Sequence, residues 1–68
     1  MNEQIQRQKV GSINVGQIVR LGNDVQGYKF LKVVKVVRQN QHMYRIDLEG
    51  ESFRRVVGAS THFDVVYA

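Results

Sequence analysis

Valine and isoleucine make up most of the apolar residues from Ile13 onward, and this constrains the fold more than any other feature of the chain. Both side chains are β-branched, so they fit strands better than helices. The residues between the apolar runs are mainly Gly, Asn, Asp and Ser, which favour turns. Alanine, the best helix former, occurs only at Ala59 and Ala68. The sequence therefore predicts an all-β fold.

The size and composition of the chain indicate one small globular domain. At 68 residues the core only just offsets the chain entropy, so association with a second chain is an open possibility. Hydrophobic residues make up 43% and charged residues 24%, which is typical of a folded protein. The absence of cysteine excludes disulfides and thiolate metal sites. Residues 1–10 lack the apolar centre of a secretory signal and no apolar run could span a bilayer, so we expect a cytoplasmic protein without membrane contact.

The spacing of apolar residues and turn residues predicts an arm followed by five strands. Residues 1–12 contain few apolar side chains and end in Gly-Ser, so we expect a flexible or loosely attached N-terminal arm, with a short helix as the alternative. The domain itself is expected over residues 13–68. Its strands are expected over residues 16–21, 28–38, 42–49 and 53–57, and around Phe63, Val65 and Tyr67.

The segment 28–38 is the one with an ambiguous period. At 100° per residue its apolar side chains gather on one side and its cations on the other, as in an amphipathic helix. Four valines around Lys35 and the lack of an N-cap residue argue against a helix. In a strand neither face would be wholly apolar or wholly polar, as is expected of a long bent strand shared by two sheets. We therefore expect a strand here.

The sequence "EGES" at residues 49–52 predicts a tight hairpin turn. If Leu48 faces Phe53 across it, Asp47 falls opposite Arg54 as a cross-strand pair. Alternation would then direct Arg55 inward, where an unpaired charge is costly, so we expect a bulge near residues 54–55. The predicted core consists of Ile18, Val19, Leu21, Phe30, Val33, Val34, Val36, Tyr44, Ile46, Leu48, Phe53, Val56, Phe63, Val65 and Tyr67.

The predicted order of strands resembles that of SH3-like small barrels, which include Tudor and KOW modules. Within it, "VGQIVRLGNDVQGYKFLKVVKV" at residues 15–36 is similar to a KOW motif, with a glycine before the first strand, Gly27 in the loop and a basic apolar strand after it. The second glycine of that motif is replaced where Phe30 or Leu31 stands. The resemblance implies an SH3-like small five-stranded barrel over residues 13–68.

Positive charge is concentrated in one part of the chain. The net charge is +4, and residues 20–38 carry five cations but only one acid, Asp24. Such a concentration of positive charge favours binding of a polyanion, and the Tyr28 ring could stack on a base. We therefore predict a non-enzymatic module that binds DNA or RNA with low sequence discrimination. If about four cations met phosphates, affinity would fall with a log-log salt slope near −3.6. The predicted nucleic-acid-binding residues are Arg20, Tyr28, Lys29, Lys32, Lys35, Arg38, Arg54 and Arg55.

Other functions receive less support from the sequence. Along a strand Lys29 and Lys35 point one way and Lys32 and Arg38 the other, so the cations could simply keep a sheet soluble. A protein-interaction or homo-oligomeric assembly module is the main alternative, because an acidic patch at residues 47–51 could meet a basic band or a free edge could add a strand. Catalysis by Ser60, His62 and Asp64 and metal binding by two isolated histidines lack the required geometry and spacing, so no cofactor is expected.

Overall fold

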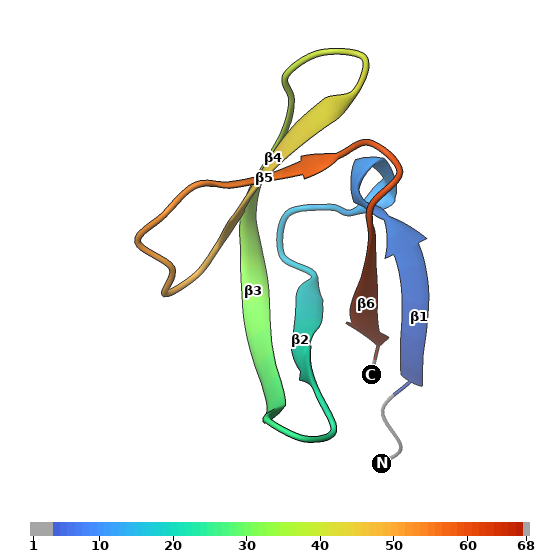
Figure 1. Ribbon diagram of the computed structural model, residues 1–68, viewed down its shortest axis with the longest axis vertical. Coiled ribbons are helices and arrows are strands. Elements are labelled where there is room, and N and C mark those ends of the chain that lie inside the picture. The colour runs from blue at the N-terminus through green and yellow to red at the C-terminus, as the bar shows by residue number, and fades with distance from the viewer. Residues whose placement is uncertain (1–3, 68) are drawn as a thin grey trace.

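The computed structural model describes residues 4–67, which form six strands and one short 3₁₀ helix. The strands form one antiparallel sheet in the order β1-β6-β2-β3-β4-β5 (Figure 1). The all-β prediction is confirmed, but β1 and β5 are free edges, so the sheet is not closed into a barrel. In chain order the elements are β1 (Gln4–Lys9), η1 (Val10–Ser12), β2 (Ile18–Asn23), β3 (Gly27–Arg38), β4 (Met43–Leu48), β5 (Arg55–Gly58) and β6 (His62–Tyr67).

Strand β3 is long and joins two halves of the sheet. Its residues 27–32 pair with β2 and its later residues with β4, with a register shift between Val33 and Lys35. A bulge of this kind bends a strand and increases its twist, and β4 and β5 accordingly turn across the end of the other strands (Figure 1). The prediction of a long bent strand is confirmed. We call β1, β6, β2 and residues 27–32 the first half-sheet, and residues 33–38, β4 and β5 the second half-sheet.

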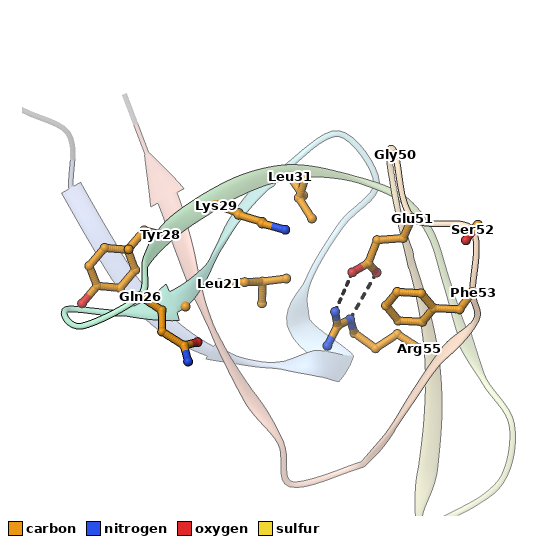
Figure 2. A pocket seen from close by; sticks show the side chains of 12 residues that line it. Leu21, Gln26, Tyr28, Lys29, Leu31, Gly50, Glu51, Ser52, Phe53 and Arg55 are labelled. Carbon is orange, nitrogen blue, oxygen red and sulfur yellow. Dashed lines mark hydrogen bonds and ion pairs between the residues drawn. The ribbon is translucent and has the colours of Figure 1, made fainter.

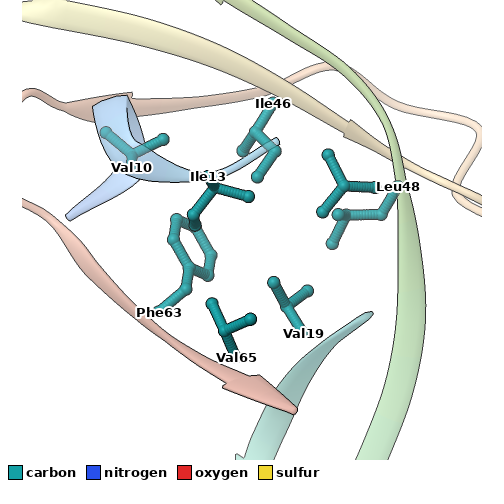
Figure 3. Close-up of a cluster of buried hydrophobic side chains, with 8 residues drawn as sticks. Val10, Ile13, Val19, Ile46, Leu48, Phe63 and Val65 are labelled. Carbon is teal, nitrogen blue, oxygen red and sulfur yellow. The ribbon is translucent and has the colours of Figure 1, made fainter. Parts of the chain in front are cut away.

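The core lies between the two half-sheets, and η1 covers one end of it (Figure 3). Leu21, Leu31, Val36, Tyr44 and Val57 are partly buried against it, as is Tyr67. The mostly apolar inner positions of β2, β4 and β6 supply this core because alternate residues of a strand share a face. The buried side chains of this core are Val10, Ile13, Val19, Val33, Ile46, Leu48, Phe63 and Val65.

Four residues predicted for the core are exposed instead. Phe30 pairs with Arg20 and Val56 pairs with Arg45, both on the side of the sheet that faces away from the core. Val34 lies at the β3 bulge, and Phe53 precedes the start of β5. In each case local pairing, which hydrophobicity does not reveal, decides the direction of the side chain. Ile18 is also on the outward side and only half-buried.

The predicted N-terminal arm is wrong for the described residues. Gln4–Lys9 is strand β1, which pairs along its whole length with β6. Val10 and Ile13 are then buried in the core, and the Val10 N–H donates to the Thr61 carbonyl at 2.9 Å. Polar side chains concealed this strand, because β1 has mostly exposed side chains and contributes backbone pairing rather than apolar surface. Residues 1–3 of the expected arm lie outside the described part of the chain.

The β4–β5 hairpin follows the predicted register but is shorter than expected. Ile46 pairs with Arg55, and the ladder ends there, so Asp47 and Arg54 do not pair within it. Asp47 lies opposite Lys35 and binds the guanidinium of Arg45 at 2.8 Å. The expected bulge near residues 54–55 is wrong, since the β4–β5 pairs are continuous. Arg55 points inward as alternation requires, and the Glu51 carboxylate balances its charge.

Candidate nucleic-acid interface

The side of the first half-sheet that faces away from the core carries most of the candidate residues. Val19 and Val65 pair with each other and are fully buried, so the residues before and after them in β2 and β6 point away from the core. The same alternation applies to β1 and to residues 27–32 of β3 through their registers. We call this surface the outer face, and its residues are Ile5, Arg7, Lys9, Ile18, Arg20, Tyr28, Phe30, Lys32, His62, Asp64 and Val66.

Arg20 is held at the middle of the outer face. Its Nη2 donates to Asp64 Oδ2 at 3.1 Å, and its guanidinium carbon lies 4.2 Å from the centroid of the Tyr28 ring. The Tyr28 hydroxyl in turn donates to Asp24 Oδ1 at 2.5 Å, which raises the pKa of Tyr28 above its ordinary 10.0. Arg20 is therefore oriented from two sides, by an ion pair and by an aromatic ring.

Phe30 offers an exposed aromatic surface beside this network. It pairs with Arg20 across the β2–β3 ladder and is 52% exposed, against 38% for Tyr28. Because Arg20 covers the Tyr28 ring, Phe30 is the aromatic ring of the outer face with more room for a stacked base. Sequence reasoning placed Phe30 in the core. Its position two residues from Tyr28 and from Lys32 was the available signal that all three share a face.

The basic stripe of β3 is divided by the bulge. With strict alternation Lys29 and Lys35 would point to the same side of β3, and Lys32 to the opposite side. The extra residue at Val34 changes this, so that Lys32 and Lys35 both point away from the core. They lie on different half-sheets. Lys29 is on the inner side with Leu31, and Arg38 is at the far end of β3, where its Nε donates to the Asn40 carbonyl at 3.3 Å.

The arginines before and in β5 lie away from the outer face. Arg54 precedes β5 and is exposed. Arg55 forms a bidentate ion pair with Glu51, at 2.6 and 3.3 Å, and its guanidinium carbon is 5.3 Å from the Phe53 ring centroid. The carboxylate balances the charge of Arg55, so this residue makes a poor phosphate ligand. Of the eight predicted residues, the structure brings together Arg20, Tyr28 and Lys32 on the outer face.

Two cations of the outer face were missed by sequence reasoning because they lie in the expected arm. Arg7 pairs with Asp64, directly across β6 from Arg20, and Lys9 pairs with His62. The alternation of glutamines with Ile5, Arg7 and Lys9 was the signal that could have indicated a strand. With them, the strand positions of the outer face carry Arg7, Lys9, Arg20 and Lys32 against a single carboxylate, Asp64.

The residues weighed for catalysis have other environments. His62 and Asp64 share the outer face, but Asp64 accepts a hydrogen bond from Arg20, and Ser60 lies in the turn before β6. Within residues 4–67, no group of three His, Cys, Asp or Glu side chains is placed to hold a metal ion.

A groove of about 700 Å³ lies on the inner side, between the β2–β3 hairpin and residues 50–53 (Figure 2). Leu21, Leu31 and Phe53 give it apolar walls. Lys29 reaches toward it from one side, and the Glu51–Arg55 ion pair borders it on the other (Figure 2). Phe53 is 54% exposed, nearly the same as Phe30, but it faces this groove rather than the outer face.

The chain matches no protein-family model, no curated protein and no solved structure. Over residues 4–67, no helix has the length and apolar character required to cross a bilayer. The function is therefore inferred from the outer face and the groove.

Proposed function

We propose that this protein is a non-enzymatic module that binds single-stranded nucleic acid through its outer face. The observation that carries the proposal is the exposed Phe30 ring beside Lys32 on β3, in a cross-strand row that continues through the ion-paired Arg20 and Asp64 to Arg7. An aromatic ring flanked by cations is the combination by which proteins hold bases and phosphates of an unpaired strand.

A single strand fits this face better than a duplex. The faces of bases are accessible to an aromatic ring only when the bases are not stacked within a helix. Stacking is worth about 1–3 kcal/mol per base and does not depend strongly on base identity. Arg7, Lys9 and Lys32 have no ion pair within residues 4–67 and supply the phosphate contacts. Contacts of these two kinds give low sequence discrimination.

The strand order also supports a finer architectural proposal. We propose that strands β6-β2-β3-β4-β5 correspond to the five strands expected of an SH3-like small barrel, here arranged as an open sheet, with β1 added beside β6. The segment similar to a KOW motif covers β2 and most of β3. In this arrangement β1 widens the outer face and adds Arg7 and Lys9 to it.

Fluorescence anisotropy with 5′-labelled 12-nucleotide poly-dT and poly-rU at about 50 mM salt tests the proposal. We expect micromolar binding, weaker binding to a duplex of equal length, and a log-log salt slope of about −2 for three phosphates on a single strand. Phe30→Ala should weaken binding roughly tenfold or more. Phe53→Ala removes an equally exposed ring from the groove and should leave the affinity unchanged. Absence of binding at about 100 μM protein, or equal losses in both variants, would reject the proposal.

A further inference from the structure

Strand β3 has an open edge along residues 27–31, where it pairs with β2 on one side but has not yet met β4 on the other. Residues 27–32 pair with β2 on one side. On the other side the ladder with β4 begins only at Val33, which pairs with Leu48, and the Glu49 N–H donates to the Lys32 carbonyl at 2.8 Å. Within the described chain, residues 27–31 therefore have no strand partner on that side.

The register shows which backbone groups this edge presents. The Val33 N–H donates to the Gln17 carbonyl at 2.8 Å, so Val33 directs its backbone groups toward the β2 side. Alternation along an antiparallel ladder sends those of Leu31 and Lys29 the same way, and those of Lys32, Phe30 and Tyr28 to the open edge. The Lys32–Glu49 hydrogen bond agrees with this. The N–H and C=O of Phe30 and Tyr28 are thus available to a further strand.

The groove described above runs beside this edge on the inner side. Leu31 and Lys29 both point to the inner side and line the groove, and Leu21 and Phe53 add apolar surface to it (Figure 2). The Glu51 carboxylate is engaged by Arg55, whereas Lys29 has no ion pair within residues 4–67. An occupant of the groove therefore meets apolar walls and one unbalanced positive charge.

We propose that this edge binds an extended segment of an acidic partner protein, which adds to the sheet as an antiparallel strand beside β3. The segment carries an apolar side chain opposite Leu31 and a carboxylate two residues later opposite Lys29, because alternate residues of the added strand face the groove. The residue between them lies opposite Phe30 and exchanges both backbone hydrogen bonds with it. This inference is independent of the proposed nucleic-acid binding.

A peptide backbone fits the edge better than the other candidates. The edge alternates donors and acceptors, as an added strand does, whereas a phosphodiester backbone offers acceptors and negative charge only. A second copy of the chain is disfavoured by charge. Its free edges within the described residues are β1, which carries Arg7 and Lys9, β5, which begins with Arg55, and residues 27–31 of β3, which carry Lys29 itself. None of these edges has a carboxylate to pair with Lys29.

The test uses an acetylated and amidated peptide, Ser-Thr-Leu-Val-Glu-Thr, titrated into the ¹⁵N-labelled protein. We expect saturable amide shifts centred on Tyr28, Phe30 and Lys32 below about 1 mM peptide, with slowed hydrogen exchange at the Tyr28 and Phe30 N–H groups. N-methylation of the peptide valine should abolish binding, because its N–H bonds to Phe30. N-methylation of the leucine, whose N–H points away, should preserve binding.

Charge reversal provides the second arm. Lys29→Glu should weaken binding of this peptide roughly tenfold, and should favour a peptide with lysine in place of glutamate. Lys35→Glu makes the same charge change on the second half-sheet and should leave the affinity within about twofold. Shifts centred on Arg7, Arg20 and Asp64 instead of Tyr28, Phe30 and Lys32, insensitivity to N-methylation of the valine, or equal effects of the two variants would overturn the proposal. Oligonucleotide binding by Lys29→Glu reports separately on the proposed function.

Discussion

The two half-sheets carry similar numbers of cations but differ in how many of these cations form ion pairs. In the second half-sheet both arginines of β4 and β5 are ion-paired, Arg45 with Asp47 and Arg55 with Glu51. Lys35 lies opposite Asp47, and Arg38 at the end of β3 has no ion pair within residues 4–67. On the outer face of the first half-sheet Asp64 engages Arg20 and leaves Arg7, Lys9 and Lys32 without ion pairs in the described chain. The comparison teaches that the pairing of charges, rather than their number, selects the candidate binding surface.

The largest expected difference between the half-sheets is the stability lost when a side chain is added to the glycine of each hairpin. Gly22 has φ +117°, and a Cβ there would lie 2.1 Å from the Gly27 carbonyl oxygen, whereas Gly50 has φ +89° with open space around it. We expect Gly22→Ala to cost about 3 kcal/mol or more, from backbone strain plus a backbone clash, and Gly50→Ala about 1 kcal/mol from strain alone. Urea denaturation of both variants measures this. Equal costs would show that the β2–β3 hairpin accommodates a side chain.

The half-sheets should also differ in how far the charge reversal of a β3 lysine weakens oligonucleotide binding. Lys32 and Lys35 both point away from the core but lie on different half-sheets. We expect Lys32→Glu to weaken oligonucleotide affinity roughly tenfold and Lys35→Glu to change it by less than about twofold. Anisotropy titrations at matched salt report both values, with circular dichroism as the control for folding. A larger loss for Lys35→Glu would move the interface to the second half-sheet.

The smallest expected effect is on acid stability. Hydrogen bonding from Arg45 lowers the pKa of Asp47 below its ordinary 3.8 and correspondingly raises that of Arg45. Because the native pKa of Asp47 lies below the unfolded value, its stabilising contribution is complete above 3.8 and is lost as the pH falls through the native pKa. Urea midpoints measured from about pH 5 down to about pH 2 should therefore fall less steeply in Asp47→Asn than in the parent. Identical profiles would show that this ion pair does not contribute to folding.

Local sequence patterns were sufficient for the parts of the molecule with a clear period. Alternation placed Ile46 and Leu48 inward on β4 and Phe63 and Val65 inward on β6, as the structure has them. It also gave the β4–β5 register. The prediction of a buried Phe30 is wrong, because hydrophobicity does not show that this residue shares the outer face with Tyr28 and Lys32. Part of the candidate site is predictable from the sequence, namely Arg20, Tyr28 and Lys32. Arg7 and Lys9 are not, because their strand has few apolar side chains and becomes part of the sheet only by pairing with β6.

The sequence by itself determined the all-β class, the extended conformation of β3 and an excess of positive charge, because β-branching, turn residues and side-chain charges are local properties. Only the tertiary structure decided that β1 joins the sheet, that the bulge after Val33 separates Lys32 from Lys35, and that Glu51 takes up Arg55. These outcomes depend on which strands pair and in what register, and pairing is settled by contacts between residues far apart in the chain.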